Sequence, residues 1–223
     1  MVQKIGVIGA GLMGNGIAHV CAVAGYDVVL ADIAEDRLTA AMEVMGRNLD
    51  RQVRRGLLDD IGRIESVQRI KTTTDYADFS DCDMVIEAAT ENEAVKRQVF
   101  EKLVPHLRAD AMIASNTSSI SITRLAATTY RPGRFMGVHF MNPVPMMSLV
   151  ELIRGIATEE ETVAAFKEMT QRLGKIPVSA EDFPAFIVNR ILLPMINEAI
   201  YTLYEGVGSV EAIDNGMKLG ANH

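Results

Sequence analysis

Cysteine and tryptophan are scarce in this 223-residue sequence, which has two cysteines and no tryptophan. The two cysteines, Cys21 and Cys82, are far apart and lie in apolar segments. This excludes a disulfide framework and leaves no cysteine pair with the spacing of a metal site, so no metal is expected. We expect two buried free thiols, in a protein of the reducing cytoplasm.

Positive charge and long apolar runs are also scarce. The formal net charge is −7, which argues against a general nucleic-acid surface. No apolar run reaches the length of a membrane span, and the first residues lead directly into an expected strand, which leaves no room for a signal peptide. The composition, 48% hydrophobic and 23% charged, is ordinary for a globular protein. The length of 223 residues allows one large domain, or one domain and part of a second.

What the sequence does contain is a glycine-rich turn near its start. The apolar run 4–8 is followed by Gly9-Ala10-Gly11-Leu12-Met13-Gly14 and then by an expected helix over 14–24. Gly9 allows a tight turn, Gly11 lets a pyrophosphate approach the backbone, and Gly14 lets the helix pack closely. Glycines also occur in turns that bind nothing, so this motif alone is a weak signal.

A second apolar run, 27–32, supplies the context because it ends in Asp32. A carboxylate at this distance after the glycines can accept both hydroxyls of an adenine ribose, and it repels a 2′-phosphate. The two features together favour a dinucleotide site over an ordinary turn, and NAD over NADP as the cofactor.

Apolar strands alternate with helices up to about residue 130. This alternation predicts a parallel sheet covered by helices on both faces, which is an α/β fold of the Rossmann type with a doubly wound sheet. The expected strands are 4–8, 27–32, 70–74, 84–88 and 111–115, and the expected helices are 14–24, 35–68, 92–107 and 121–127.

The stretch 35–68 is long for a simple connection between strands. Gly56 and Asp59-Asp60 interrupt it, which predicts two helices in an antiparallel hairpin. Four arginines gather near the end of the first helix. They fit a solvated helix face and a basic patch for a phosphorylated substrate about equally well. These residues are Arg47, Arg51, Arg54 and Arg55.

After residue 130 the pattern changes to a pair of strands. Residues 134–140 and 148–153 are apolar runs, and the loop between them contains two prolines. A hairpin-like pair would place His139 beside Glu151. Each side chain alone is more often a polar group of the core, but together they suggest a dyad in which the carboxylate orients the imidazole and raises its basicity. Downstream we expect helix 159–173, strand 175–178, connector 180–184, and helices 185–205 and 209–218.

Further polar residues follow the strands on the side where open α/β sheets bind ligands. Ser118 lies in the run 115–119 after a strand, and Glu91 and Lys96 follow the strand 84–88. A turn or helix cap explains the serine run as well, and a solvated helix pair explains Glu91 and Lys96. Asn189 stands in an apolar helix start, where its amide needs a partner if it is buried.

These segments together resemble the L-3-hydroxyacyl-CoA dehydrogenase family, and most closely its bacterial members that act on 3-hydroxybutyryl-CoA. The resemblance runs over the whole chain. It is carried by the glycine turn 9–14, Ala114 to Ser119, Gly137 to Pro145, Leu149 to Glu151, Val188 to Arg190 and Met217 to His223.

The resemblance implies an oxidoreductase that passes a hydride from C3 of a 3-hydroxyacyl-CoA to NAD. It implies His139 as general base with Glu151 as its partner, and Ser118 and Asn189 as groups that hold the reacting oxygen. It favours CoA phosphate binding for Arg51, Arg54 and Arg55. The residues that it assigns to the cofactor are Gly9, Gly11, Leu12, Met13, Gly14, Asp32, Glu91, Lys96 and Asn142.

The sequence departs from the family pattern in two places. Pro184-Ala185-Phe186 stands where the family usually has Pro-Gly-Phe, and the chain ends at His223, where family members continue with more helices. We therefore expect a dinucleotide-binding domain over 1–183 and part of a helical substrate and dimerisation domain over 184–223, with a homodimer as the full-length form. Apolar residues of its first helix are then expected to be exposed, such as Ile191, Leu192 and Met195.

Two other functions stay open at the level of the sequence. One is a related NAD-dependent dehydrogenase that acts on a hydroxy acid without CoA. The other is a nucleotide-binding protein that lacks turnover because part of its structure is missing. The complete set of active-site residues argues against a loss of turnover through those residues.

Overall fold

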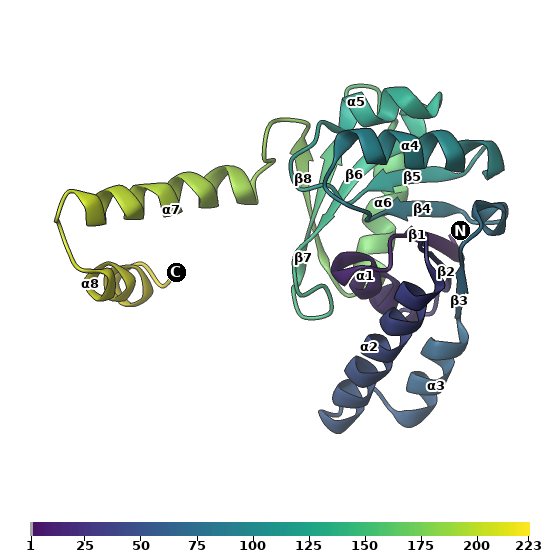
Figure 1. The fold of residues 1–223 in the computed structure, drawn as a ribbon, viewed down its shortest axis with the longest axis horizontal. Coiled ribbons are helices and arrows are strands. Elements are labelled where there is room, and N and C mark those ends of the chain that lie inside the picture. The colour runs from purple at the N-terminus through teal and green to yellow at the C-terminus, as the bar shows by residue number, and fades with distance from the viewer. Residues whose placement is uncertain (1) are drawn as a thin grey trace.

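The computed structural model describes residues 2–223, and its centre is an eight-stranded sheet (Figure 1). The strands β1 to β6 are parallel, β7 is antiparallel to β6, and β8 is parallel to β7. The expected Rossmann-type doubly wound sheet is confirmed. Along the sheet the order is β3 (Ile70–Thr73), β2 (Asp27–Ala31), β1 (Lys4–Ile8), β4 (Met84–Glu87), β5 (Met112–Ser115), β6 (Phe135–Phe140), β7 (Leu149–Arg154) and β8 (Ile176–Glu181).

The direction of the strand order reverses between β1 and β4. From β1 the chain runs outward through β2 to β3, and it then returns to add β4, β5 and β6 on the other side of β1. At such a reversal the two connections leave in opposite directions and open a crevice at the carboxyl ends of the strands. The turn after β1 and the loop after β4 therefore line one crevice.

Helices cover both faces of the sheet, and each face has its own layer of buried side chains. One layer includes Ile17, Met45 and Phe166, and the other includes Phe100 and Leu125. Because both faces are covered, a central strand such as β4 is buried at every position, and it is apolar except for Glu87 at its end. The covering helices are α1 (Leu12–Val23), α2 (Glu35–Arg54), α4 (Glu93–Leu103), α5 (Ile122–Ala126) and α6 (Glu160–Arg172).

The expected helical hairpin is present as α2 and α3 (Asp60–Gln68), and it projects from the sheet in Figure 1. Gly56 follows α2 with a φ of 69°, a left-handed conformation that glycine adopts without strain. Asp59 caps α3 by accepting a hydrogen bond from the backbone N–H of Gly62. Shorter 3-10 turns cover Tyr76–Phe79, Val104–His106, Ala127–Thr129 and Pro132–Arg134.

The chain after β8 extends away from the sheet as α7 (Val188–Tyr204) and α8 (Val210–Asn215), followed by a π-helical turn over Gly216–Gly220 (Figure 1). No residue of α7 is buried, and Ile191 is 64% exposed, while Leu192 and Met195 are half-buried. Within residues 2–223 no helix is both long and apolar enough to span a membrane.

The expected helix start at Ala185 is wrong by three residues. Ala185 and Phe186 have φ values of 65° and 54°, which are left-handed, and α7 begins at Val188. The Phe186 side chain is 3% exposed and packs in the core on one face of the sheet. The chain turns at Ala185 and Phe186 to bury this side chain, and the helix starts only after that turn. The expected connector also starts later, because β8 continues to Glu181.

Candidate functional site

The glycine turn after β1 is tightly packed at Gly14 and open at Gly11. A Cβ at Gly14 would lie 1.7 Å from the carbonyl oxygen of Gly9, whereas a Cβ at Gly11 would have no protein atom within 4 Å. Gly11 is the N-cap of α1 and offers no side-chain hydrogen bond to the helix end. The free space and the uncapped N–H groups fit the pyrophosphate of a dinucleotide.

Asp32 follows β2 and faces the same turn. Its Oδ2 accepts a hydrogen bond from Ala10 N at 2.7 Å, and its Oδ1 accepts one from Ile33 N at 2.8 Å. The carboxylate is therefore fixed at the place where an adenine ribose is expected. A cavity of about 400 Å³ lies beside it, with Ile33, Arg37, Tyr76, Val95 and Val99 among its walls.

A second cavity of about 360 Å³ meets the first one at Met13, Ala88 and Ala89. Its walls bring together six residues that the sequence suggested for the site, each from a different element or loop. These are Met13, Glu91, Ser118, His139, Asn142 and Asn189. The two cavities together form a trench across the carboxyl ends of β1 and β4, which is where a sheet of this type binds a dinucleotide.

His139 and Glu151 face each other across the β6–β7 pair, as expected from the hairpin-like arrangement. His139 Nδ1 lies 2.7 Å from Glu151 Oε2, and Glu151 is fully buried. Nδ1 therefore donates to the carboxylate, which leaves Nε2 as the basic nitrogen of a residue that lines the cavity. The arrangement suits a general base whose tautomer is held by the carboxylate.

Glu151 also binds the start of α7. Its Oε1 accepts hydrogen bonds from the backbone N–H groups of Ile187 and Val188 at 3.0 and 2.9 Å. Burial raises the pKa of Glu151, but the bonds from His139, Val188 and Ile187 outweigh it and the net pKa lies below the ordinary value. One ionised carboxylate thus holds both the imidazole and the helix that carries Asn189.

Glu91 holds the serine run in the same way. Its Oε1 accepts hydrogen bonds from Thr117 Oγ1 at 2.7 Å, from Ser118 N at 2.7 Å and from Ser118 Oγ at 2.9 Å. Burial raises the pKa of Glu91, but these bonds and the charge of Lys96 bring the net pKa below its ordinary value. Ser118 is fixed by Glu91 on the wall of the cavity that contains His139.

Lys96 lies beneath the cavity rather than in its wall. It is 1% exposed, and its Nζ donates to Glu87 at 2.8 and 2.9 Å and lies 3.6 Å from Glu91. The alternative of a solvated pair of Glu91 and Lys96 is therefore wrong for Lys96. Glu87 is itself fully buried and also accepts a bond from Ser115 Oγ at 2.6 Å.

Two family descriptions match almost the whole chain. Residues 4–183 match "3-hydroxyacyl-CoA dehydrogenase, NAD binding domain", and residues 186–223 match "3-hydroxyacyl-CoA dehydrogenase, C-terminal domain". The chain belongs to the 3-hydroxyacyl-CoA dehydrogenase family. It is an NAD-dependent oxidoreductase.

Known members of the 3-hydroxyacyl-CoA dehydrogenase family are similar over the full chain. A 3-hydroxybutyryl-CoA dehydrogenase of Bradyrhizobium diazoefficiens is 60% identical over all of this chain and 76% of its own length. The crystal structure of (S)-3-hydroxybutyryl-CoA dehydrogenase from Ralstonia eutropha is 48% identical, with a TM-score of 0.98 over all of this chain and 79% of its own. The fatty acid oxidation complex subunit alpha of Acinetobacter baumannii is 42% identical over 97% of this chain and 30% of its own length.

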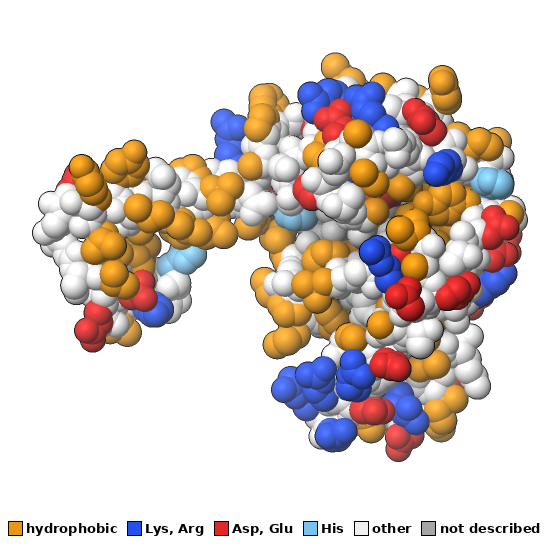
Figure 2. Space-filling model, in the orientation of Figure 1, with side chains coloured by type: hydrophobic (Ala, Val, Ile, Leu, Met, Phe, Trp, Pro, Cys, Tyr) orange, Lys and Arg blue, Asp and Glu red, His pale blue; other side chains and the backbone are white. Residues whose placement is uncertain are grey.

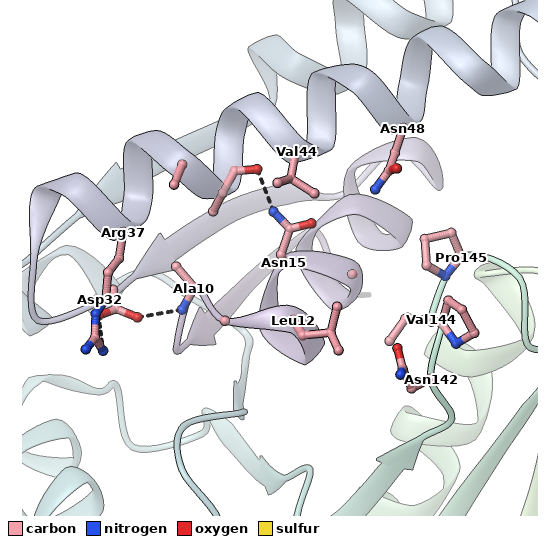
Figure 3. A pocket seen from close by; sticks show the side chains of 15 residues that line it. Ala10, Leu12, Asn15, Asp32, Arg37, Val44, Asn48, Asn142, Val144 and Pro145 are labelled. Atoms are coloured by element: carbon pink, nitrogen blue, oxygen red, sulfur yellow. Dashed lines mark hydrogen bonds and ion pairs between the residues drawn. The ribbon is translucent and has the colours of Figure 1, made fainter.

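This member of the 3-hydroxyacyl-CoA dehydrogenase family has a third cavity, of about 500 Å³, on the other side of the glycine turn (Figure 3). It lies between α1, α2 and the loop 141–147, and Val44, Asn48, Asn142 and Pro145 are in its walls. Arg51, Arg54 and Arg55 are exposed at the end of α2 and do not line it, although Arg51 Nη2 donates to Asn48 Oδ1 at 2.6 Å. Figure 2 shows Lys and Arg side chains gathered over this end of the helical hairpin.

Several residues in the walls were missed at the level of the sequence. Ile33, Arg37 and Tyr76 line the cavity beside Asp32. Asn116 lines the cavity that contains His139, and it accepts a hydrogen bond from Phe140 N at 2.9 Å at the end of β6. Cys21 and Cys82 are buried free thiols, and burial raises the pKa of each to about 12. Within residues 2–223 no three His, Cys, Asp or Glu side chains gather as a metal site.

Proposed function

We propose that this chain oxidises a short-chain (S)-3-hydroxyacyl-CoA, with 3-hydroxybutyryl-CoA as the best candidate, to the 3-oxoacyl-CoA. The reverse reduction would use the same groups. The observation that carries the proposal is that His139, Ser118 and Asn189 line one cavity at the end of the trench, with the buried Glu151 bonded to His139. The names of the relatives from Bradyrhizobium and Ralstonia support the choice of acyl group.

In the proposed mechanism His139 takes the proton of the substrate hydroxyl on Nε2. Glu151 keeps the Nδ1 proton in place and stabilises the imidazolium that forms. Ser118 and Asn189 hold the reacting oxygen from the cavity wall. Bound NAD supplies the hydride acceptor for the carbon that bears this oxygen. In the reverse direction the protonated His139 returns its proton to the oxygen.

The proposed cofactor contacts follow the trench. Gly9, Gly11, Leu12 and Met13 lie along the pyrophosphate path, and Gly14 allows the close packing below it. Asp32 would bind the adenine ribose, while Glu91 and Asn142 border the nicotinamide end. Lys96 contributes through Glu91, because its ammonium is buried behind that carboxylate.

The proposed path of CoA is the cavity between α2 and the loop 141–147. It reaches the reacting cavity at Asn142, which lies in the walls of both. The arginines at the end of α2 lie beyond Asn48, on the solvent side of this path, where the phosphates of CoA would be exposed. A role for Arg51, Arg54 and Arg55 in binding these phosphates is the part of the proposal that separates CoA substrates from free hydroxy acids.

We also propose a division into a dinucleotide-binding domain over 1–183 and a helical substrate and dimerisation domain from 184 onward. The exposed apolar residues of α7 and α8 support a homodimer through this second part, which sedimentation at several concentrations would test. The two buried free thiols support a reducing compartment such as the cytoplasm.

Replacement of His139 tests the proposal. His139→Ala should lower kcat for acetoacetyl-CoA reduction by at least ~100-fold, while the Kd for NADH stays within about twofold, because the base is lost and the trench is not. His106→Ala, at an exposed histidine in the 3-10 turn Val104–His106, is the matched control and should leave both values unchanged. Wild-type turnover by His139→Ala would refute the assignment.

A further inference from the structure

The adenosine end of the trench carries a cation that the glycine motif does not include, Arg37 in the first turn of α2. Its Nη1 lies 3.5 Å from Oδ1 of Asp32. Figure 3 shows the guanidinium directly beside this carboxylate. Asp32 and Arg37 are the charged residues in the walls of this cavity within the described part of the chain.

The two side chains are held very differently. Asp32 is 8% exposed and accepts a backbone hydrogen bond on each oxygen, from Ala10 and from Ile33. Its carboxylate therefore stays at the ribose position. The Arg37 side chain is 62% exposed, so its guanidinium can follow a ligand without breaking a packed structure.

An adenosine in this cavity would bring its 2′ position against both charges. A 2′-hydroxyl donates a hydrogen bond to the Asp32 carboxylate. A 2′-phosphate is repelled by Asp32 and attracted by a guanidinium that lies a few ångströms away. The preference for NAD over NADP then depends on two opposed effects on the 2′-phosphate, repulsion by Asp32 and attraction by Arg37, and not on the carboxylate alone.

We propose that Arg37 is a second residue that determines cofactor specificity, and that it opposes Asp32. In the intact chain it weakens the rejection of NADP. Without the Asp32 carboxylate it becomes the binding group for the 2′-phosphate. The inference rests on the proposed placement of the adenosine beside Asp32, which is tested separately by the effect of Asp32→Ser on NADH binding.

The experiment measures the Kd of NADH and of NADPH by fluorescence titration for the wild type, Asp32→Ser, Arg37→Gln and the double variant. Asp32→Ser should weaken NADH and lower the ratio of the NADPH Kd to the NADH Kd by at least about tenfold. In that background Arg37→Gln should raise the NADPH Kd about tenfold and change the NADH Kd less than twofold, because only NADPH carries the phosphate. Arg37→Gln alone should raise the ratio by about threefold.

The matched control is Arg47→Gln, at an arginine of the same helix that is also 61% exposed and lies roughly 15 Å further along the axis. It should leave the ratio unchanged. Two results would overturn the inference: an NADPH Kd that does not respond to Arg37→Gln in the Asp32→Ser background, or equal weakening of NADH and NADPH. The second result would make Arg37 a general contact of the adenosine and not a specificity residue.

Discussion

Gly11 and Gly14 lie in one turn but are glycines for different reasons. At Gly14 an added Cβ would strike the Gly9 carbonyl oxygen, which belongs to the protein itself. At Gly11 the backbone is extended, with a φ of −68°, and an added Cβ would strike nothing. The fold therefore requires glycine at position 14, and we propose that the bound cofactor requires it at position 11.

We predict that alanine at these two positions separates cofactor binding from stability. Gly11→Ala should leave Tm nearly unchanged but raise the NADH Kd at least ~10-fold, because the methyl group occupies the space of the pyrophosphate. Gly14→Ala should lower Tm by roughly 5 °C or more, because helix and turn must move apart. Calorimetry and NADH titration measure the two effects, and normal NADH affinity in Gly11→Ala would contradict the placement of the cofactor.

Ala185 is an alanine in a conformation that favours glycine, with a φ of 65°. It is one of the two places at which the sequence departs from the pattern of the family that it resembles. The left-handed conformation costs an alanine roughly 1–2 kcal/mol. Glycine removes this cost but adds conformational entropy to the unfolded chain, which offsets part of the gain.

We predict that Ala185→Gly increases the free energy of unfolding by about 0.5–1 kcal/mol. Chemical denaturation followed by circular dichroism measures the change. Ala157→Gly is the matched control, because Ala157 lies in an exposed turn without a positive φ and should lose stability. A loss of stability at both positions would show that Ala185 is not strained.

Among the elements, the start of α7 depends on a residue of the sheet. Glu151 in β7 uses one oxygen for His139 and the other for the N–H groups of Ile187 and Val188. A carboxylate at a helix N-terminus is favourable both as a cap and through the helix dipole. The dyad and the helix that carries Asn189 are therefore fixed by the same group.

We predict that Glu151→Gln and Glu151→Ala separate these two tasks. In Glu151→Gln the amide oxygen can still accept from Ile187 and Val188, while its NH₂ faces Nδ1 and forces the ring proton onto Nε2, so kcat should fall at least ~100-fold. Glu151→Ala should lose the same activity and also the protection of the two amides in hydrogen exchange. Protection that is equal in both variants would contradict the link between β7 and α7.

The elements themselves were largely predictable from the sequence. Strand and helix alternation indicated the doubly wound sheet, and the two apolar runs around a short loop indicated the register that pairs His139 with Glu151. The start of α7 was not predictable, because two left-handed residues leave no signal when neither is glycine. The burial of Lys96 was not predictable, because its partner Glu87 lies in a strand and no pattern in the sequence links the two residues.

The walls of the trench were the least predictable part of the site. Arg37, Tyr76 and Val99 come from three elements far apart in the sequence, and only the folded sheet brings them together. None belongs to a motif with fixed spacing. Glycines and catalytic polar groups can be recognised from local pattern, whereas the shape of a cavity depends on which elements the fold makes neighbours.

At the scale of the whole molecule, one surface is basic although the net charge of the chain is negative. The chain carries a net charge of −7, yet the end of α2 is locally basic and its arginines are exposed. An acidic protein repels the phosphates of CoA at long range unless a local positive field attracts them. Exposed charges of this kind act through a screened field, so their effect must weaken as salt rises.

We predict that replacing Arg51, Arg54 and Arg55 together by glutamine raises KM for acetoacetyl-CoA at least ~10-fold at low salt, with kcat within about twofold, because the arginines are remote from His139. The increase should shrink above roughly 0.5 M salt, where the wild type also loses the attraction. A short acetoacetyl thioester without the nucleotide should show no change in KM. The control replaces three exposed lysines elsewhere, Lys71, Lys102 and Lys167, by glutamine. If the arginine variant changes KM equally for acetoacetyl-CoA and for the short thioester, the arginines belong to a solvated helix face and do not bind CoA.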